Sequence, residues 1–232
     1  MSDDTDNTQF DRVLGVLGGM GPEATVDFMD KLVTATPAEV DQDHIETVVY
    51  NDPKIPDRNQ AILEGAESPL PRLKRNVNRL EELGVDVLAL PCNTAHYYFE
   101  DLASESDAAL INMISRTREV IEEMGIESAG LLATETVMEA GVYDDEFAES
   151  PVDLVEPADR DALMSCIYDI KRKNHQQAQD SYDEVIRQLM EREVSCLIVG
   201  CTDLALLEVE FDIPVVDTTS VLVDACIDRT RA

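Results

Sequence analysis

The sequence predicts an α/β fold of two similar Rossmann-like lobes with parallel sheets, related by a pseudo-twofold axis. Two observations predict it. Short β-rich runs alternate with helical patterns along the 232 residues, which is typical of parallel α/β proteins. The two halves of the sequence also resemble one another. Residues 14–19 resemble residues 129–134, residues 88–94 resemble residues 198–202, and the first and second of these segments are separated by a similar number of residues in each half.

The elements follow from local patterns. The β-rich runs predict strands at residues 12–17, 46–50, 85–90, 129–133, 152–155, 195–199 and 215–217. Apolar side chains that recur every three or four positions predict helices at about 23–35, 70–83, 158–193 and 220–231, with a further helix from about 136. Gly84 ends the second helix, and Ser220 is placed to cap the last. Pro53 and Pro56 predict a turn-rich segment after the second strand.

No low-complexity linker separates the halves, so we expect the chain to cross between lobes near Asn112 and again near Pro214. The first lobe then comprises residues 12–111 with 215–232, the second comprises 112–214, and residues 1–11 form an acidic tail. Ligands bind at the carboxyl ends of the strands in parallel α/β sheets. The sequence therefore predicts a ligand site between the lobes.

The composition excludes several classes of partner. The chain has 49 acidic and 18 basic residues, a formal net charge of −31, and 5% aromatic residues. Such a surface repels phosphate backbones and anionic lipids, so we expect neither nucleic acid nor a membrane as partner. The acid excess extends along the whole chain. This favours a halophilic protein over an ordinary acidic one. In a salt-saturated cytoplasm, hydrated carboxylates keep such a protein dissolved.

The sequence also predicts a cytoplasmic protein without a metal site. No apolar run reaches the roughly 18 residues of a membrane helix, and the first 11 residues lack the basic and apolar regions of a signal peptide. The five cysteines are an odd number without C-x-x-C spacing, and the three histidines are scattered. Neither a disulfide framework nor a zinc site is expected from this pattern.

Cys92 and Cys201 are the strongest candidates for chemistry. Each follows an apolar strand and precedes a predicted helix, where free backbone N–H groups and the helix dipole stabilise a thiolate and lower the pKa of the thiol. Either cysteine alone is equally consistent with a packing residue. Their matching places in the two halves favour a paired active site, whereas Cys166, Cys196 and Cys226 fall inside predicted elements and are assigned to packing.

The glycine loop after the first strand is less specific. Gly19-x-Gly21-x-x-Ala24 fits the dinucleotide fingerprint, but the next strand does not end in the acidic residue that this motif requires. A loop that binds a small anion is favoured over a nucleotide site, and a tight turn is the simplest alternative.

Two cations stand out in a chain with few of them. Arg58 follows a proline-stiffened turn and Lys171 ends a predicted helical turn. Arg binds a carboxylate through two hydrogen bonds and Lys as a point charge, although both residues are usually solvated at the surface. His96 lies one helical turn after Cys92, where it either tunes the thiol or packs.

Seven segments, in order, resemble the cofactor-independent aspartate/glutamate racemases. They extend over nearly the whole chain from Val13 to Asp217, and PCNTAH and GCT are the most specific. The segments are GVLGGMGPEAT at 15–25, YN at 50–51, IPDR at 55–58, PCNTAH at 91–96, LLAT at 131–134, IYDIK at 167–171 and GCTDL at 200–204.

The resemblance implies an isomerase, a racemase of aspartate or glutamate that uses no pyridoxal phosphate or other cofactor and forms a homodimer. Cys92 and Cys201 match the two acid/base thiols on opposite faces of the substrate's α-carbon. The positions that match substrate-binding residues are Met20, Asn51, Arg58, Asn93, Thr94, Thr134, Lys171, Thr202 and Asp203. Asp203 stands where the family often has the longer Glu.

Three other functions stay open at this point. Two of them belong to the same superfamily, a maleate-type isomerase and a hydantoin racemase, and both use cysteine. The presence of both thiols favours a two-way racemase over a one-sided isomerase, and the two cations suit a substrate with two carboxylates better than a hydantoin. The third is a dinucleotide-binding or thiol-redox sensor module built on the glycine loop, which is not an enzyme.

Overall fold

The computed structural model of this chain describes residues 10–209 and 211–231. Residues 1–9 of the expected acidic tail lie outside this part. The last two residues of that tail are docked rather than frayed, because Phe10 forms an antiparallel bridge with Arg231 and the Asp11 N–H donates to the Thr230 carbonyl at 3.2 Å.

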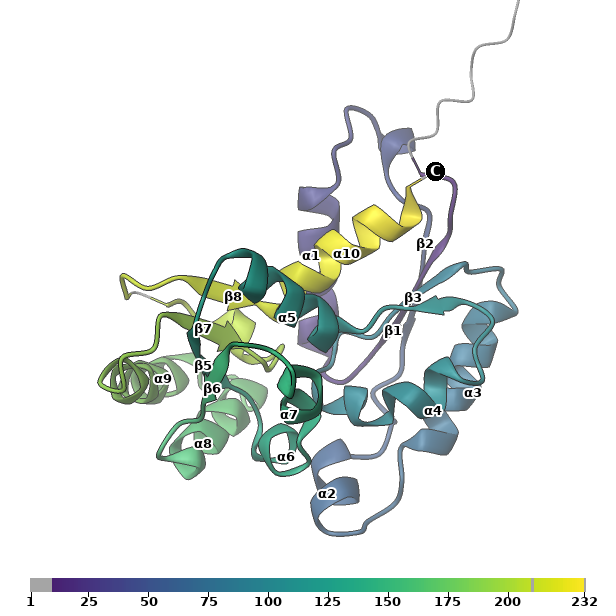
Figure 1. The fold of residues 1–232 in the computed structure, drawn as a ribbon. Helices are drawn as coiled ribbons and strands as arrows, with labels where there is room; N and C mark the ends of the chain where they lie inside the picture. Colours follow the sequence, from purple (N-terminus) through teal and green to yellow (C-terminus); the bar gives the residue numbers. More distant parts are fainter. Residues whose placement is uncertain (1–9, 210, 232) are drawn as a thin grey trace, which may run out of the picture.

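Two four-stranded parallel sheets form the centre of the molecule (Figure 1). The first contains β1 (Leu14–Gly18), β2 (Thr47–Asn51), β3 (Val87–Ala89) and β4 (Ala109–Leu110), in the order β2-β1-β3-β4. The second contains β5 (Ser128–Leu132), β6 (Asp153–Val155), β7 (Cys196–Val199) and β8 (Val215–Asp217), in the order β6-β5-β7-β8. The two orders are the same, which confirms the predicted pair of similar α/β lobes.

Helices connect the strands, as parallel pairing requires. In the first half these are α1 (Pro22–Ala35), α2 (Arg58–Leu63), α3 (Leu70–Glu81) and α4 (Phe99–Ala103). In the second they are α5 (Met113–Glu123), α6 (Glu135–Glu139), α7 (Val142–Phe147), α8 (Arg160–Lys171) and α9 (His175–Met190), and α10 (Thr218–Thr230) follows the last strand. Three short 3₁₀ helices complete the described part: η1 (Asp41–Asp43), η2 (Thr94–Tyr98) and η3 (Leu204–Leu206).

Two helix predictions were wrong in detail. The stretch 158–193 is two packed helices, α8 and α9, because the chain turns back at Lys173, whose φ of 66° lies in the left-handed region. The last helix is capped by Asp217, whose carboxylate accepts from the backbone N–H groups of Thr219 and Ser220 at 2.9 and 3.2 Å, rather than by Ser220 itself. The short elements α2, β4 and α5 were not predicted.

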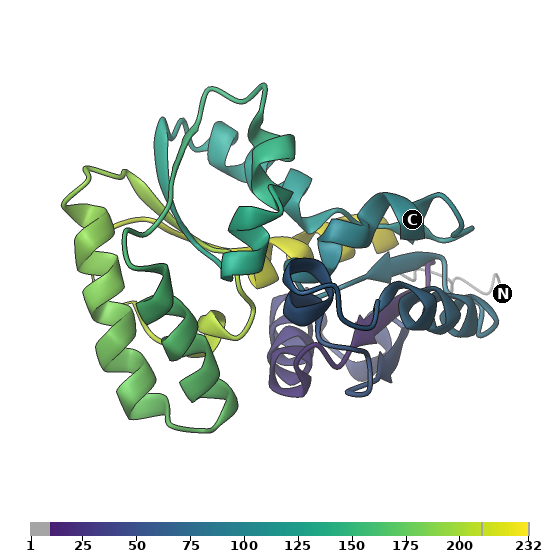
Figure 2. The same cartoon turned by 90° about the horizontal axis from the view of Figure 1, so that it is seen from below.

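The predicted lobe boundary near Pro214 was placed a few residues too early. β8 pairs with β7, so residues 215–217 belong to the second sheet and not to the first lobe. Only α10 then returns to pack on α1 and β3, and in Figure 2 it is the yellow helix that reaches from the second lobe toward the first. Most of its side chains are buried, so both lobes cover it.

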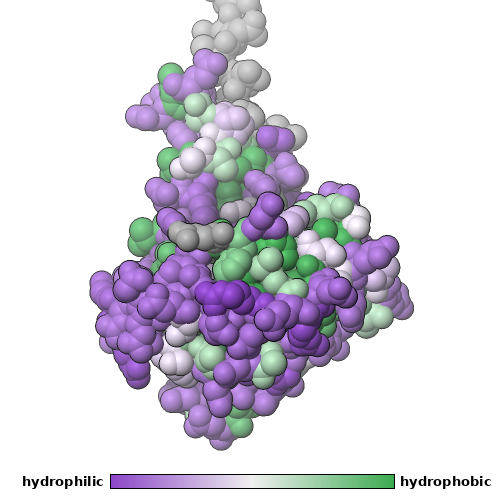
Figure 3. All heavy atoms as spheres, turned by 90° about the vertical axis from the view of Figure 1, so that its left-hand side faces the viewer, coloured by the Kyte–Doolittle hydropathy of each residue, from purple (hydrophilic) through white to green (hydrophobic). Residues whose placement is uncertain are grey.

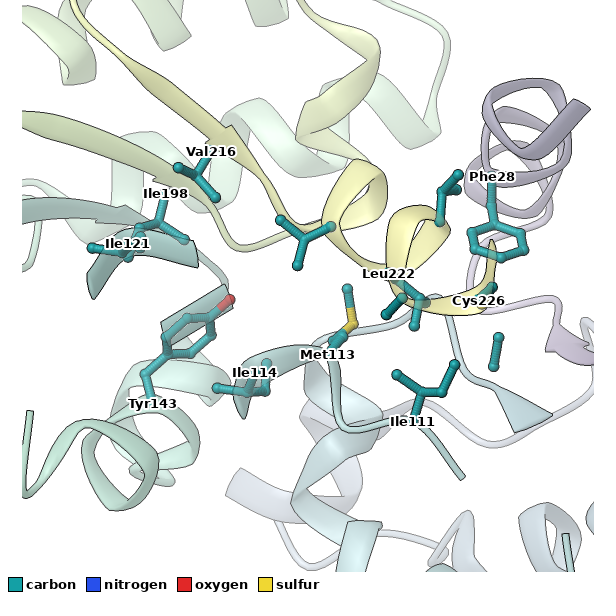
Figure 4. Packing of buried hydrophobic residues seen from close by; sticks show 14 of the residues in the cluster. Phe28, Ile111, Met113, Ile114, Ile121, Tyr143, Ile198, Val216, Leu222 and Cys226 are labelled. Atoms are coloured by element: carbon teal, nitrogen blue, oxygen red, sulfur yellow. The ribbon is translucent and has the colours of Figure 1, made fainter. Parts of the chain in front are cut away.

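One hydrophobic core joins the lobes through α10 (Figure 4). Phe28 of the first lobe and Ile198 of the second belong to this same cluster, with Leu222 and Cys226 of α10 in it. A helix that is apolar on almost all sides loses the hydrophobic free energy of burial if either lobe moves away. Packing against α10 therefore restrains the position of one lobe relative to the other.

Hydrophilic side chains cover most of the face seen in Figure 3, around a smaller hydrophobic area. None of the helices in the described residues is long and apolar enough to span a membrane. All five cysteines are buried free thiols. Burial raises the pKa of Cys166 to about 12 and that of Cys196 to about 11, which is consistent with their assignment to packing.

Candidate active site

Both strand-end cysteines line one small cavity between the lobes. Cys92 comes after β3 of the first sheet and Cys201 after β7 of the second, and both thiols are buried. The cavity is lined by Met20, Arg58, Asn59, Cys92, Asn93, Thr94, Thr134, Lys171, Cys201, Thr202 and Asp203. Its volume is about 20 Å³, room for about one water molecule. A ligand larger than water therefore does not fit unless the cavity widens.

The structure brings together all predicted site residues except Asn51. Asn51 ends the edge strand β2, where its backbone pairs with Gly18 and its side chain is exposed outside the cavity. Asn59 lines the cavity instead and was not predicted. The feature of the sequence that could have predicted Asn59 is the helix cap Asp57-Arg58-Asn59. The Asp57 carboxylate accepts from the Asn59 N–H at 2.8 Å and caps α2. This cap places Arg58 and Asn59 in the first turn of the helix.

The cysteines are not followed by α-helices, contrary to the prediction. A 3₁₀ helix begins at Thr94 after Cys92, and after Cys201 there is only the three-residue η3. The helix dipole that was expected to lower the pKa of each thiol is therefore weak or missing here. For Cys201 the direction is reversed: burial first, and Asp203 second, raise the pKa of its thiol to about 12, against the smaller effect of Lys171.

We predict that Cys201 of the ligand-free protein reacts slowly with iodoacetamide at pH 7 and that its rate rises about tenfold per pH unit up to about pH 11. The thiolate is the nucleophile, and a raised pKa leaves little of it at neutral pH. Mass spectrometry of the Cys201 peptide along a pH series measures this rate. A rate that levels off near pH 8 would contradict a raised pKa.

Three charged side chains surround the cysteines. Lys171, in the last turn of α8, lies 3.4 Å from Asp203, measured from Nζ to Oδ2. Burial by itself lowers the pKa of Lys171, but Asp203 and Cys201 outweigh this effect and the pKa is raised, so the ammonium is charged. Burial also raises the pKa of Asp203, and Lys171 opposes that rise.

Arg58 has a hydrogen-bond donor that no described residue uses. Its Nη1 donates to the Pro56 carbonyl at 3.2 Å and its Nη2 to the Met20 carbonyl at 3.5 Å, while Nε is buried with no hydrogen-bond partner among the described residues. A buried charged donor without a partner costs free energy. The guanidinium is therefore available to an anionic ligand in the cavity.

The glycine loop shapes this wall of the site. The Thr25 hydroxyl accepts from the Gly19 N–H at 2.9 Å and donates to the Gly21 carbonyl at 3.0 Å, which closes the loop upon itself. Gly19 has a φ of 99°, and a Cβ there would lie 2.4 Å from the backbone of Asp52. The loop thereby presents Met20, whose carbonyl holds Arg58, to the cavity.

Hydrogen bonds cross between the lobes around the cavity. The hydroxyls of Thr94 and Thr134 lie 3.2 Å apart, and the Thr202 hydroxyl donates to the Pro91 carbonyl at 3.5 Å. Thr134 is also the N-cap of α6, where its hydroxyl accepts from the Val137 N–H at 3.3 Å. Thr94, Thr134 and Thr202 thus belong both to the lining of the cavity and to the contact between lobes.

His96 contacts the backbone of Cys92 and not its thiol. The Met113 N–H donates to His96 Nε2 at 3.2 Å, so the proton is on Nδ1, which donates to the Cys92 carbonyl at 3.0 Å. Burial lowers the pKa of His96, which keeps the ring neutral. The histidine connects the Cys92 loop to the start of α5 in the second lobe.

Comparison with known proteins agrees with this arrangement. Residues 17–226 match the family model described as Asp/Glu/Hydantoin racemase. The chain is similar to the broad-specificity amino-acid racemase RacX of Bacillus subtilis, with 26% identity over 95% of this chain and 99% of that one. Its fold is similar to Picrophilus torridus aspartate racemase, with a TM-score of 0.89, 35% identity, and 95% and 94% of the two chains covered.

A more distant structure shares the fold. Glutamate racemase isoform RacE1 of Bacillus anthracis has a TM-score of 0.71 and 13% identity, over 95% of this chain and 82% of that one. The family model covers far more than half of the chain, and it includes both strand-end cysteines and every other residue of the cavity. The chain therefore belongs to the Asp/Glu/Hydantoin racemase family and is a racemase, an enzyme of the isomerase class.

Proposed function

We propose that this amino-acid racemase interconverts the L and D forms of aspartate or glutamate, with Cys92 and Cys201 as its two acid/base groups. The observation that carries the proposal is the position of two buried thiols, one from each lobe, in the same cavity as Arg58 and Lys171. Racemisation removes a proton from one face of the α-carbon and returns one to the other. Two groups in opposite protonation states, on opposite sides of the substrate, meet this requirement.

The proton balance is simple. One cysteine acts as thiolate and takes the α-proton, which leaves a carbanion; the other acts as thiol and donates its proton to the opposite face. The product leaves with the two protonation states exchanged, and the reverse reaction restores them. Asp203 and Lys171 both affect which thiol is ionised, because Asp203 raises the pKa of Cys201 and Lys171 lowers it.

The α-proton of an amino acid is only weakly acidic, so the carbanion needs hydrogen-bond donors. Thr94 and Thr134 line the cavity, and the hydroxyl proton of this pair that is not used between them is suited to the α-carboxylate. A cavity this small holds about one water molecule, so nearly all solvent is excluded from it, which strengthens each of these contacts. No cofactor is needed in this scheme, since the proton transfers use only side chains of the chain itself.

Local charge supports an acidic substrate. Residues 54–79 contain six of the 18 basic residues of the chain, although its net charge is −31. These six are Lys54, Arg58, Arg72, Lys74, Arg75 and Arg79. Of these six, Arg58 lines the cavity, and its buried Nε, which has no partner among the described residues, is suited to the side-chain carboxylate of the substrate. Asp203, which also lines the cavity, is suited to the ammonium group of the substrate. The similarity to an aspartate racemase agrees with this assignment.

Proton exchange in D2O tests the proposal. Wild-type protein in about 2 to 3 M KCl is incubated with L- or D-aspartate and L- or D-glutamate, and α-deuterium incorporation is followed by NMR together with chiral chromatography. We expect deuterium at the α-carbon of both enantiomers of at least one of the two amino acids, with inversion. L-Alanine, which lacks a second carboxylate, is the control. If neither acidic amino acid exchanges its α-proton, the proposal is wrong.

The acidic composition leads to a prediction for stability. We expect the melting temperature to rise by roughly 6 to 12 °C between 0.2 and 3 M KCl, which corresponds to a gain of about 3 kcal/mol for a chain of this size. Salt screens the repulsion among 49 acidic side chains that only 18 basic ones offset. Differential scanning calorimetry along a KCl series measures the melting temperature. A melting temperature that does not change with KCl concentration would contradict salt adaptation.

A further inference from the structure

Two buried polar side chains, Asn93 and Thr218, connect the two cysteine loops, and a third, Tyr143, holds the Asn93 amide from the second lobe. The Tyr143 hydroxyl donates to Asn93 Oδ1 at 2.8 Å, Asn93 Nδ2 donates to the Thr218 hydroxyl at 3.0 Å, and the Thr218 hydroxyl donates to the Val199 carbonyl at 2.9 Å. Asn93 directly follows Cys92 in the chain. Val199 comes two positions before Cys201. We refer to Tyr143, Asn93 and Thr218 as the relay.

The direction of every hydrogen bond in the relay is determined. Thr218 has one hydroxyl proton, which it donates to the Val199 carbonyl, so its oxygen can only accept from Asn93. The amide nitrogen of Asn93 must then point to Thr218 and the amide oxygen to Tyr143. Each member thereby determines the orientation of the next, and such buried chains strengthen cooperatively.

The relay is buried between the lobes. The exposed fractions of Tyr143, Asn93 and Thr218 are 1%, 2% and 0%. Tyr143 comes from α7 of the second lobe, Asn93 from the first lobe, and Thr218 is the first residue of α10. Figure 4 shows the ring of Tyr143 pointing away from its helix, with the hydroxyl oxygen at its inner end.

Tyr143 also lies close to the second cysteine loop. A Cβ built on Gly200 would lie 3.1 Å from the Tyr143 hydroxyl oxygen, tighter than an ordinary contact. Glycine at the position before Cys201 therefore lets this hydroxyl approach the backbone of that loop while it binds Asn93 beside Cys92. The same oxygen is adjacent to both catalytic loops.

Complete hydrogen bonding is not general among the buried hydroxyls of this protein. The hydroxyls of Tyr182, Thr136 and Thr219 are buried and have no partner among the described residues. Tyr182 and Thr219 have the same residue types and the same near-zero exposure as Tyr143 and Thr218. The relay is thus distinguished by its connections and not by burial.

We propose that Tyr143 and Thr218 are positioning residues which, through Asn93, hold the Cys92 and Cys201 loops at one separation and orientation. This inference rests on the proposed two-thiol mechanism, in which both sulfurs must reach the same α-carbon from opposite sides. A misplacement of about 1 Å can cost about 100-fold in rate. The α-carboxylate and ammonium contacts of the substrate do not involve either residue, since neither lines the cavity.

Conservative substitutions test the relay. Tyr143→Phe and Thr218→Val remove one hydroxyl each and preserve side-chain shape. We expect kcat to fall by about 10- to 100-fold in both directions of the reaction, with KM changed by less than about threefold. The matched controls Tyr182→Phe and Thr219→Val remove hydroxyls that have no partner. We expect their kcat values within about twofold of wild type.

The double variant separates a relay from two independent effects. Among the described residues, Tyr143 and Thr218 are hydrogen-bonded to one another only through the Asn93 amide, whose orientation depends on both partners, so the loss of either one already releases Asn93. We expect Tyr143→Phe with Thr218→Val to lose about as much kcat as the more damaged single variant. Losses that multiply would show that the two residues act independently and would overturn the proposal.

A second readout does not depend on catalysis. Amide hydrogen exchange of the ligand-free protein is followed in peptides that contain Cys92 and Cys201. We expect faster exchange in both peptides for each relay variant and in neither for the controls. Faster exchange confined to the substituted residue's own segment would overturn the relay. If wild-type protein racemises no acidic amino acid, the proposed function fails, and the exchange pattern still decides whether the relay couples the two loops.

Discussion

Replacing Cys92 or Cys201 by alanine is expected to lower the rate of racemisation by about 100- to 10,000-fold in both directions. In the proposed mechanism each thiol serves one face of the α-carbon, and loss of a general acid or base typically costs about 100- to 10,000-fold. No other described side chain in the cavity is a thiol, and the carboxyl group of Asp203 is paired with Lys171. Chiral chromatography of each enantiomer measures the rate.

The two variants are also expected to differ from one another. A protein with one remaining thiol can still exchange the α-proton that faces it, but cannot deliver a proton to the opposite face. In D2O, Cys92→Ala should label one enantiomer without inversion and Cys201→Ala the other. Cys226→Ala is the matched control, because Cys226 is a buried thiol in the core around α10. Racemisation by either site variant within about tenfold of wild type would contradict the two-thiol mechanism.

Arg58→Gln is expected to lower kcat/KM for the acidic substrate by about 100- to 1,000-fold. Loss of one partner of an enclosed, hydrogen-bonded charge pair costs about 2 to 5 kcal/mol, and tenfold corresponds to about 1.4 kcal/mol. Arg58 lines the cavity and its buried Nε has no partner among the described residues, so in the proposed function it contacts the substrate directly. Steady-state kinetics at high KCl, where long-range fields are screened, measures the effect.

Arg75→Gln is the control for this prediction. It removes the same charge from the same cationic segment, but Arg75 is exposed and does not line the cavity. We expect its kcat/KM at high KCl within about twofold of wild type. Equal losses in both variants would mean that the general field of residues 54–79, and not a contact made by Arg58, is responsible for substrate binding.

Much of the fold could be predicted because it depends on local pattern. A buried parallel strand is a short apolar run, and an amphipathic helix repeats its apolar residues with a period of 3.6, so the longer elements lie close to their predicted places. The wrong details are short or capped elements. The turn at Lys173 interrupts a helical pattern that continues on both sides, and Asp217, three residues before Ser220, is the residue whose carboxylate caps α10.

Site residues could be predicted where they belong to a continuous motif. The residues at 92–94 and 201–203 follow strands and line the cavity, because strand ends of parallel sheets meet at one edge. Asn51 and Asn59 show the limit of this reasoning. Both are asparagines near the proline-rich turn, and only the capped first turn of α2 decides that Asn59 reaches the cavity and Asn51 does not.

The sequence by itself determined the alternation of strands and helices and the thiol at a strand end in each half, since these follow from short stretches of adjacent residues, whereas only the structure placed Arg58 and Lys171 beside the thiols. Only the tertiary structure decided that β8 belongs to the second sheet, that burial raises the pKa of Cys201, and that Tyr143 reaches Asn93 from 50 residues away in the chain. These features depend on which surfaces pack together. Burial and hydrogen bonding between distant segments are consequences of that packing and leave no periodic signal in the sequence.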